Sequence, residues 1–451
     1  MKVKNICCIG AGYVGGPTMA VIAQKNPYVK ITVVDANPER IKAWNSPLDQ
    51  LPIYEPGLAE VVKQTRNKNL FFSTEISKAI DQAQIIFMAV NTPTRNEGEG
   101  AGMAADLSYI EACAKDIAQY SKSDKIIVEK STVPIRTAEK IKEILDANSG
   151  SVHFEILSNP EFLAEGTAIS DMKSPDRVLI GGDKSKSGQK AIQTLVNIYA
   201  NWIPKEKILT TNVWSSELAK LASNAMLAQR VSSINSLSSL CEKTGANIEE
   251  LSKAIGMDHR IGPHFMKASV GFGGSCFQKD ILNLVYLCKY YGLGKVAEYW
   301  HQVVKINDYQ KGRFAQKIID HFGGDLTGKQ IAILGWAFKA NTNDSRESPA
   351  IAVSEKLFSA RANLIIYDPM VSKKTIWNDI EKYWITKRED FDLKSKITVS
   401  ESINDAIKKS DSVAILTEWE EFKKLDSFTL QVFDGRNILN KSLFSIGKIN
   451  G

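Results

Sequence analysis

The chain has few of the residues that characterise secreted, zinc-binding or nucleic-acid-binding proteins. Its 451 residues include only 6 cysteines, which are scattered and form no CxxC pair, so we expect neither a disulfide framework nor a metal site. Lys and Arg number 57 against 51 Asp and Glu, a net charge of +6 without any dense basic run, which argues against nucleic acid as a partner. No segment is long and apolar enough to span a bilayer, so we expect no membrane partner and a cytoplasmic location.

What the chain does contain is the pattern of an α/β protein. The hydrophobic fraction of 43% and the charged fraction of 24% are those of a globular protein, and the length suggests several domains at roughly 100–200 residues each. Short β-branched runs alternate with amphipathic stretches in the first third, which is typical of βα units that build a parallel sheet. The strands predicted there are residues 3–9, 31–35, 85–90, 125–129, 155–157 and 177–180.

A different pattern fills the middle of the chain. Residues 214–244 form an uninterrupted helical stretch without Gly or Pro, and helical segments continue to about residue 322. The βα alternation then restarts, with strands predicted at 329–335, 364–367, 412–416 and 432–434. The sequence therefore predicts an α/β fold of two doubly wound Rossmann-like domains joined by a long helical connector. The predicted domain boundaries are 1–212, 213–324 and 325–451.

A glycine-rich motif follows the first predicted strand and precedes a helix-like stretch. Gly10 permits the tight turn of the motif GxGxxG, Gly12 lets backbone N–H groups approach a pyrophosphate, and Gly15 lets the helix pack closely. The next strand ends at Asp35, about 20 residues farther on, where a carboxylate accepts hydrogen bonds from ribose hydroxyls and repels a 2′-phosphate. The motif predicts a site that prefers NAD to NADP, although Arg40 is a counter-indication because it can stack on adenine or accept a phosphate. The C-terminal strands lack this motif, so their domain binds a different nucleotide or is purely structural.

The most specific signal is GFGGSCFQKD, at residues 271–280. Its glycines bring the backbone close to a ligand, and Cys276 then begins a helix-like run that lasts to Tyr290. A helix N-terminus stabilises a thiolate, Lys279 adds positive potential, and Asp280 lies one turn on at i+4. An activated cysteine beside a carboxylate predicts covalent catalysis. A single cysteine is otherwise a small buried hydrophobe, which is our interpretation of the other five.

Three shorter patterns support this chemistry. SNPEFLAEG places Glu161 and Glu165 directly after a strand, at the sheet edge where open α/β folds bind ligands, and Glu161 suits a general base; a solvated Glu pair is the alternative. Lys220 and Asn224 share a helix face at i and i+4, where they can hold an oxyanion; a surface lysine is the alternative. The loop EKSTVP, at 129–134, leaves a strand end with hydroxyls that can position a water.

Together these motifs resemble the nucleotide-sugar dehydrogenase family, most closely its eukaryotic UDP-glucose 6-dehydrogenase branch. The resemblance covers almost the whole chain, in order, through GAGYVGGPT, NSPLDQLPIYEPGL, VNTPT, EKSTVP, SNPEFLAEGTAI, PDRVLIGG, ELAKLASNAMLAQR, GFGGSCFQKD, FKANTNDSRESPA and FDGRN. It implies a four-electron oxidation of UDP-glucose to UDP-glucuronate with two NAD used in turn. The alternatives are a sister enzyme acting on UDP-N-acetylmannosamine or GDP-mannose, a two-electron 3-hydroxyacid dehydrogenase, and a catalytically silent NAD-binding protein.

The resemblance also implies how the reaction proceeds. Cys276 traps the C6 aldehyde as a thiohemiacetal, a second hydride transfer gives a thioester, and water hydrolyses it. Lys220 and Asn224 stabilise the oxyanion, Asp280 and the loop of Ser131 and Thr132 organise water and proton transfer, and Glu161 assists hydrolysis. The catalytic residues that the resemblance implies are Cys276, Lys220, Asp280, Glu161, Asn224 and Thr132.

The binding residues and the assembly follow from the same resemblance. The cofactor-binding residues implied are Gly10, Gly12, Tyr13, Val14, Gly15, Asp35, Arg40, Val90, Thr92, Ser131, Glu165, Lys279 and Arg346. The substrate-binding residues implied are Phe162, Leu163, Arg260, Lys267, Phe272, Gly273, Phe338, Lys339 and Arg436, with Arg260 contributed across a subunit interface. One departure is Asn437, where animal members usually have a second Arg, which leaves that contact to Arg436. A homo-oligomer is expected, built from dimers through the connector, with a hexamer as in animal-type members a further option.

Overall fold

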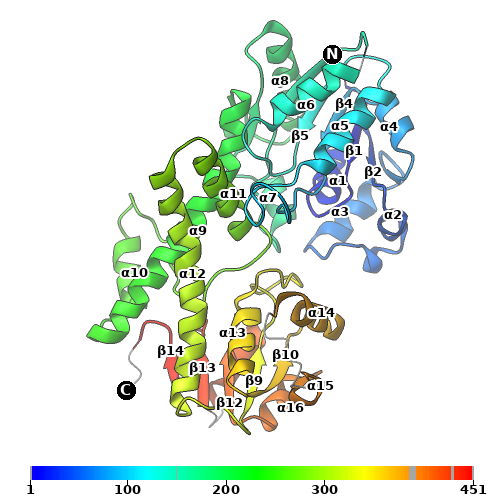
Figure 1. Ribbon diagram of the computed structural model, residues 1–451. Helices are drawn as coiled ribbons and strands as arrows, with labels where there is room; N and C mark the ends of the chain where they lie inside the picture. Colours follow the sequence, from blue (N-terminus) through cyan, green and yellow to red (C-terminus); the bar gives the residue numbers. More distant parts are fainter. Residues whose placement is uncertain (1–2, 149, 385–392, 428–430, 449–451) are drawn as a thin grey trace. The chain divides into compact units, whose positions relative to one another are not determined.

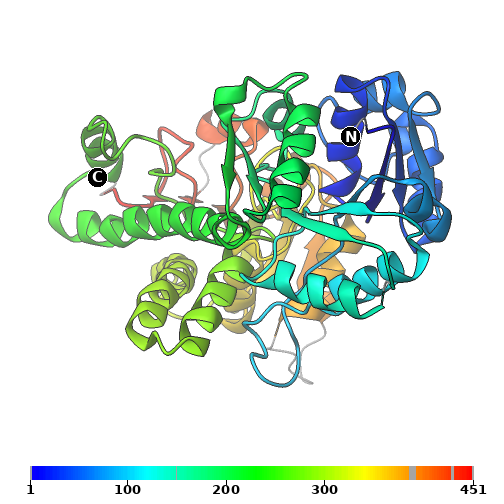
Figure 2. The ribbon, with the colours of Figure 1, turned by 90° about the horizontal axis from the view of Figure 1, so that it is seen from above.

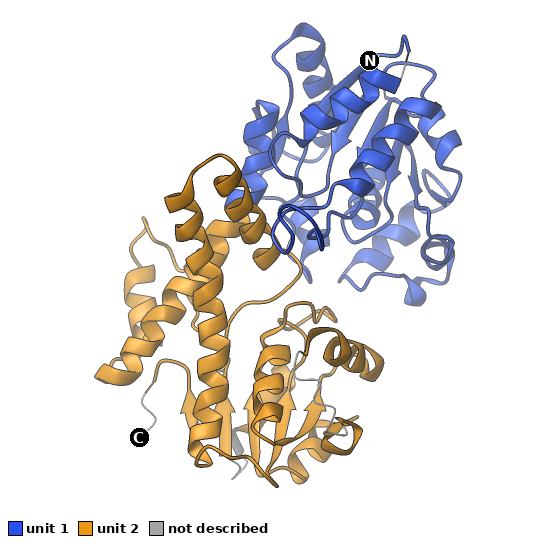
Figure 3. Cartoon of the chain, viewed as in Figure 1, with its two compact units in different colours: residues 1–223 blue, residues 224–451 orange. Residues whose placement is uncertain are grey.

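The computed structural model describes residues 3–148, 150–384, 393–427 and 431–448. It divides into two compact units, residues 1–223 and 224–451, which Figure 3 colours separately. The boundary falls inside helix α9 (Val213–Thr244), so that one helix belongs to both units.

Unit 1 is built on an eight-stranded sheet, counted over its described residues, in the order β3-β2-β1-β4-β5-β6-β7-β8. The first six strands are parallel, in the order typical of a Rossmann domain. β7 meets β6 antiparallel through Ser158 and Gly181, and β8 runs parallel to β7. The strands are β1 (Asn5–Ile9), β2 (Lys30–Val34), β3 (Leu70–Ser73), β4 (Ile85–Met88), β5 (Lys125–Glu129), β6 (Phe154–Ser158), β7 (Val178–Gly181) and β8 (Ile208–Thr211).

Helices cover both faces of this sheet because its strands are apolar on both sides. Neighbouring residues of β1 show this directly, since Cys8 packs into one buried cluster with α1, α3 and α8 while Cys7 packs into another with α4, α5 and α6. The helices are α1 (Gly15–Lys25), α2 (Pro38–Asn45), α3 (Leu58–Thr65), α4 (Ile76–Gln82), α5 (Ser108–Tyr120), α6 (Thr137–Asn148), α7 (Ala168–Lys173) and α8 (Lys186–Tyr199).

Unit 2 has a sheet of its own, six-stranded over the described residues and entirely parallel, in the order β11-β10-β9-β12-β13-β14. Renumbered from β9, this is again the Rossmann order. Its strands are β9 (Gln330–Leu334), β10 (Asn363–Tyr367), β11 (Ile397–Val399), β12 (Ser412–Ile415), β13 (Gln431–Asp434) and β14 (Phe444–Ser445). Its helices are α10 (Ile248–Gly256), α11 (Phe277–Tyr290), α12 (Gly294–His321), α13 (Pro349–Ser359), α14 (Lys373–Tyr383), α15 (Leu393–Lys396) and α16 (Ile403–Lys408).

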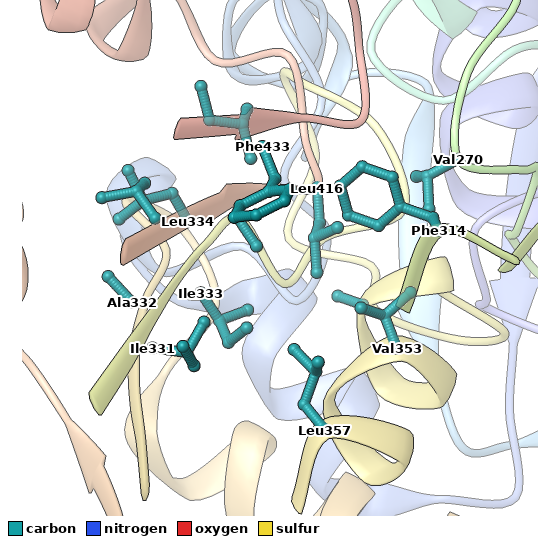
Figure 4. Close-up of a cluster of buried hydrophobic side chains, with 14 of the residues drawn as sticks. Val270, Phe314, Ile331, Ala332, Ile333, Leu334, Val353, Leu357, Leu416 and Phe433 are labelled. Carbon is teal, nitrogen blue, oxygen red and sulfur yellow. The ribbon is translucent and has the colours of Figure 1, made fainter. Parts of the chain in front are cut away.

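One hydrophobic core holds unit 2 together. Phe314 of α12 and Val353 and Leu357 of α13 lie over the strand β9, and Phe433 of β13 completes the cluster in Figure 4. Because these side chains come from the helices and the sheet alike, the helix α12 and the Rossmann-like sheet form a single packed body within this unit.

The long helix α9 has 32 residues and runs unbroken in Figures 1 and 2, which confirms the helix predicted at 214–244. It contains no helix-breaking residue and ends at Gly245, whose φ of +83° suits a C-cap. The two sheets and this helix confirm the predicted fold class. Among the described residues, none of the helices has the length and apolar character that a membrane span requires.

Candidate active site

The glycine turn after β1 has the shape of a phosphate-binding turn. Gly10 has a φ of +108°, and a Cβ there would lie 2.3 Å from the Ala89 carbonyl oxygen. A Cβ on Gly15, the first residue of α1, would lie 2.0 Å from the Gly10 oxygen, whereas one on Gly12 would meet no atom within 4 Å. The turn therefore requires glycine at two positions and leaves open backbone at the third, beside a helix N-terminus that attracts an anion.

Asp35 follows β2 directly and ties this turn to the second strand. Its Oδ2 accepts hydrogen bonds from the Ala11 N–H at 2.9 Å and from Arg40 Nη1 at 3.1 Å, while its Oδ1 accepts one from the Asn37 N–H at 2.9 Å. A carboxylate at this position suits the ribose of NAD and disfavours a 2′-phosphate. The described residues of unit 1 thus fit the adenosine and pyrophosphate parts of NAD.

In unit 2 an aspartate binds the first turn in the same way, although that turn lacks the glycines of the GxGxxG motif. Gly335 follows β9 with a φ of +97°, and Asp368 after β10 accepts hydrogen bonds from the Trp336 N–H at 2.7 Å and the Ala337 N–H at 2.9 Å. The Trp419 indole also donates to Asp368, at 3.1 Å, and the Trp336 side chain is fully buried. In place of Ala11 and the open Gly12 of unit 1, this turn carries the buried Trp336 and Ala337.

The EKSTVP loop is fastened to the end of β4. Ser131 Oγ donates a hydrogen bond to the Val90 carbonyl at 2.6 Å, and Thr92 Oγ1 donates one to the Thr132 carbonyl at 2.7 Å. The structure thus brings together four residues that the sequence analysis assigned to the cofactor site and its proton transfer.

Glu55 is a residue that the sequence analysis missed. Its carboxylate accepts a hydrogen bond from the Tyr13 hydroxyl and two more from the N–H groups of Gly166, at 2.9 Å, and Ala168, at 2.6 Å. Burial and then the hydrogen bond to Glu55 raise the pKa of Tyr13, so the phenol stays protonated. Glu55 lies in the motif YEPGL, and two of its three partners come from a segment more than 100 residues farther along the chain. No local pattern in the sequence therefore reveals its role.

The segment SNPEFLAEG is an irregular loop after β6, so its two carboxylates do not share a helix face. Glu161 is buried and Glu165 only partly buried. Glu161 Oε1 lies 2.9 Å from Lys220 Nζ, and its Oε2 accepts a hydrogen bond from the Leu163 N–H at 2.7 Å. Burial raises the pKa of Glu161, but Lys220, the Leu163 N–H and Lys130 together outweigh it, and the pKa is lowered overall. Lys220 itself is 3% exposed, so the alternative of a surface lysine does not hold.

Phe162 lies between two cations of unit 1. The Arg177 guanidinium carbon is 3.8 Å from the centre of its ring, and Lys220 Nζ is 5.7 Å from it. The sequence analysis did not single out Arg177, whose stacking on the ring fixes the loop that carries Glu161 and Leu163.

In unit 2, Cys276 is the N-cap residue of α11. Its carbonyl accepts a hydrogen bond from the Asp280 N–H at 2.9 Å, and its Sγ lies 3.4 Å from Ser275 Oγ. Cys276 is partly exposed, whereas the other five cysteines are free and buried, as predicted. Burial, for example, raises the pKa of Cys8 to about 12. Cys276 is also the one cysteine of the six that lies at a helix N-terminus.

Asp280 is the buried carboxylate of the same helix, 1% exposed. Its Oδ2 accepts a hydrogen bond from Asn224 Nδ2 at 2.6 Å, and its Oδ1 lies 3.9 Å from Lys279 Nζ. Asn224 and Lys220 lie one turn apart on α9. The amide of Asn224 binds Asp280, and the ammonium of Lys220 forms an ion pair with Glu161.

The glycines before Cys276 let the loop approach the segment after β9 closely. A Cβ on Gly273 would lie 2.4 Å from the Glu347 carbonyl oxygen, and the Gly274 N–H donates to the Arg346 carbonyl at 2.8 Å. Phe272 is fixed by Asn307, which accepts from its N–H at 2.8 Å and donates to its carbonyl at 3.0 Å. Asn307 is a further residue that the sequence analysis missed.

Arg436 also joins these segments. Its Nη2 donates to the Phe338 carbonyl at 2.9 Å and its Nε to the Leu416 carbonyl at 2.7 Å. The predicted substrate residues Phe338 and Lys339 lie together, with Lys339 Nζ 5.7 Å from the Phe338 ring centre. Asn437 holds both the N–H and the carbonyl of Ile446, at 2.9 and 2.8 Å, so it stabilises the C-terminal strand.

Three predicted basic residues lie at the surface of unit 2. Arg260 and Arg346 each pair with an aspartate two residues earlier, Asp258 and Asp344, at 2.6 Å in both cases. Lys267 is exposed. Within the described residues, no group of three or more His, Cys, Asp or Glu side chains is arranged to hold a metal ion.

A Rossmann sheet with a dinucleotide turn defines the class of NAD-linked oxidoreductases. Residues 4–203, 214–309 and 332–441 match the NAD binding, central and UDP binding domains of the UDP-glucose/GDP-mannose dehydrogenase family. The chain belongs to this family, which confirms the resemblance predicted from its motifs and the NAD cofactor.

Known proteins similar to this chain agree with that assignment. UDP-glucose 6-dehydrogenase 1 of Glycine max is 56% identical over 467 residues, covering 98% of this chain and 97% of its own. UDP-glucose 6-dehydrogenase of Pongo abelii is 56% identical over 448 residues, covering 97% and 90%. The solved structure of a UDP-glucose dehydrogenase from the hyperthermophilic archaeon Pyrobaculum islandicum has a TM-score of 0.85 at 29% identity, covering 99% of this chain and 98% of that one.

Proposed function

We propose that the chain catalyses the NAD-dependent, four-electron oxidation of UDP-glucose to UDP-glucuronate. The family membership and the relatives named UDP-glucose 6-dehydrogenase support this substrate. Cys276 at the N-terminus of α11 is the observation that carries the proposal. An aldehyde carbon cannot lose its hydride until a nucleophile adds to it, so an enzyme that oxidises past the aldehyde benefits from such a thiol.

The first oxidation converts the C6 alcohol into an aldehyde. NAD, when bound, is the hydride acceptor of both oxidations. Lys220 and Asn224 stabilise the oxyanion that develops as the C6 hydroxyl loses its proton, and their burial strengthens that electrostatic effect. Asp280 and Thr132 organise the water and the proton transfer.

The second oxidation takes place on the cysteine. Cys276 Sγ forms a bond to C6 while the carbonyl electron pair moves to oxygen, which takes up a proton to give the thiohemiacetal. Loss of a hydride from C6 and of the hydroxyl proton leaves a thioester. Water then attacks the thioester carbon, the C6–S bond breaks, and the sulfur leaves as thiolate. Glu161, which the described structure holds as a carboxylate beside Lys220, accepts the proton of that water.

The remaining assignments stay predictions. They are the cofactor and substrate contacts inferred from the sequence, the three domains ending at residues 212, 324 and 451, and a cytoplasmic location. The alternative substrate is UDP-N-acetylmannosamine or GDP-mannose, because a sister enzyme would use the same cysteine and the same glycine turn. Relatives at 54–56% identity that are named UDP-glucose 6-dehydrogenase favour UDP-glucose.

We also propose a homo-oligomer built on a dimer, with a hexamer as a further option. The helix α9 carries large apolar side chains that unit 1 and unit 2 leave exposed in the chain by itself. They are Trp214, Leu218, Met226, Leu237 and Leu240. A second copy of this chain would bury such a surface.

The reaction is tested by the ratio of NADH formed to UDP-glucose consumed by the purified protein. Two NADH per sugar are expected. One NADH per sugar would indicate a simple alcohol oxidation and remove the role of Cys276, and turnover with another nucleotide sugar alone would overturn the substrate but keep the mechanism.

The thiol is tested by Cys276→Ser, with Cys288→Ser on the same helix as the matched control, because Cys288 is buried and lies away from the helix N-terminus. Cys276→Ser is expected to lose acid formation while binding UDP-glucose and NAD as before, and Cys288→Ser to keep turnover. Unchanged turnover of Cys276→Ser would refute the mechanism.

A further inference from the structure

Lys130 is a buried cation for which the proposed reaction has no use. It follows β5 directly and is 6% exposed, and its Nζ donates a hydrogen bond to Asn159 Oδ1 at 3.1 Å. None of the described carboxylates lies within ion-pair distance of it, although a buried ammonium without a direct ionic partner is costly. Its presence needs a reason.

Holding Asn159 is not that reason. Asn159 Oδ1 also accepts a hydrogen bond from the Tyr199 hydroxyl at 2.6 Å, and its Nδ2 donates to the Leu179 carbonyl at 2.7 Å. The amide therefore keeps two partners, one at each end, without the lysine.

The titratable groups that face Lys130 come from three other elements. The charged ones are Glu161 in the loop after β6 and Lys220 on α9, and the third is the Cys8 thiol on β1, which is neutral because burial raises its pKa to about 12. The Tyr199 ring of α8 lies 6.0 Å from Lys130 Nζ. Burial lowers the pKa of Lys130 to about 8, with Glu161 opposing the shift and Lys220 adding to it. Lys130 is therefore cationic at neutral pH and loses its charge as the pH rises through about 8.

The pair Glu161–Lys220 is neutral as a whole, so these two side chains alone offer no net attraction to an anion. We propose that Lys130 is a positioning residue that acts through this pair: its ammonium gives the three side chains one surplus positive charge, which stabilises the oxyanion held by Lys220. Solvent screens a buried charge only weakly, so the Lys130 ammonium can stabilise the oxyanion electrostatically without contacting the substrate. This inference rests on the role of Lys220 in the proposed function.

The test compares kcat and KM for UDP-glucose across pH 6–10 in Lys130→Met and Lys130→Arg. Lys130→Met is expected to lower kcat by roughly tenfold to a hundredfold with KM little changed. The wild-type kcat is expected to decrease as the pH rises through about 8, and Lys130→Met is expected to lack this decrease. Lys130→Arg keeps a permanent charge, so it is expected to restore kcat and move the fall to higher pH. Lys115→Met, an exposed lysine on α5, is the control.

Two results would overturn the inference. One is a Lys130→Met variant with the wild-type kcat and pH profile, and the other is a folded Lys130→Arg variant as impaired as Lys130→Met. Should the arginine fail to fold in the buried space, the Lys130→Met profile decides alone. A failure of the proposed function is distinguishable, because wild type itself would then not form two NADH per sugar.

Discussion

At the scale of single residues, burial decides which polar side chains take part in chemistry. Lys220 is 3% exposed and Asp280 is 1% exposed, and each has a partner at hydrogen-bond distance, in Glu161 and Asn224 respectively. A charge removed from water is stable only when paired, and its electrostatic effect is then strong. The same residue types on the surface, such as Arg260 with Asp258, interact in water and are screened.

Gly10 is the residue whose replacement tests the dinucleotide turn most sharply. Gly10→Ala is expected to weaken NAD binding by roughly a hundredfold or more, because the new methyl would lie 2.3 Å from the Ala89 oxygen in a φ of +108°. NADH fluorescence titration measures it. Gly98→Ala is the control, since Gly98 also has a positive φ, of 75°, but open space around it. Equal NAD affinity in the two variants would contradict the fit of this turn to the cofactor.

Much of the candidate site was predictable from residue order, because glycine spacing and a cysteine at a helix start act through the local backbone. The partners were not. Glu55 binds groups more than 100 residues away, and Arg177 stacks on Phe162, contacts that depend on how the strands are ordered. Glu161 and Glu165 do follow a strand, as predicted, but their segment forms an irregular loop in which Glu161 is buried and Glu165 only partly buried.

At the scale of elements, the start of α6 is organised by two buried carboxyl groups. Glu217 of α9 accepts hydrogen bonds from the Arg136 N–H at 2.7 Å and the Ala138 N–H at 2.8 Å, which caps the helix. Glu129, at the end of β5, is 1% exposed, and no N–H of the described residues reaches its oxygens. Burial and then Glu217 raise the pKa of Glu129 well above its ordinary value, so it holds a proton.

A raised pKa in the folded state means that folding takes up a proton, so stability falls as the pH rises above the ordinary carboxyl value of 4.5. Glu129→Gln removes this cost, because an amide is neutral and donates a hydrogen bond to Glu217. Its melting temperature at pH 8 is expected to exceed that of wild type by roughly 2–4 °C, with a smaller gain at pH 5. Glu143→Gln on the exposed face of α6 is the control, and a gain that does not depend on pH would exclude the shared-proton explanation.

The predicted elements were mostly correct where a segment was both long and apolar, as with β5, predicted at its observed bounds of Lys125–Glu129. The strands that the sequence analysis omitted lie at the edges of the two sheets. They are β3 (Leu70–Ser73), β8 (Ile208–Thr211), β11 (Ile397–Val399) and β14 (Phe444–Ser445). An edge strand of two to four residues depends on its neighbour for pairing, so its own sequence carries little signal.

At the scale of the whole molecule, each unit contains a sheet of Rossmann order, and α9 belongs to both units. The exposed apolar side chains of that helix support the proposed homo-oligomer. The fold class followed from the sequence because alternating βα units restrict a chain to few topologies. The number of copies does not follow from that pattern.

The assembly is tested by the double variant Met226→Glu and Leu240→Glu, which places two charges on side chains that are 54% and 60% exposed in the single chain. A smaller particle mass by light scattering is expected, because burying a charge at an interface is unfavourable. Lys190→Glu, on the exposed side of α8, controls for the added negative charge. A mass identical to that of wild type would place the interface elsewhere.

The brace between a glycine turn and the aspartate of the second strand occurs twice, as Gly10 with Asp35 and as Gly335 with Asp368. In each copy the glycine N–H donates to the last residue before that aspartate, at 2.8 Å both times. Because the same hydrogen bonds recur where the GxGxxG glycines are missing, the brace by itself is a property of the fold and not a mark of a dinucleotide site. What distinguishes the turn of unit 1 is the open Gly12, whereas Gly335 in unit 2 is followed by the buried Trp336 and Ala337.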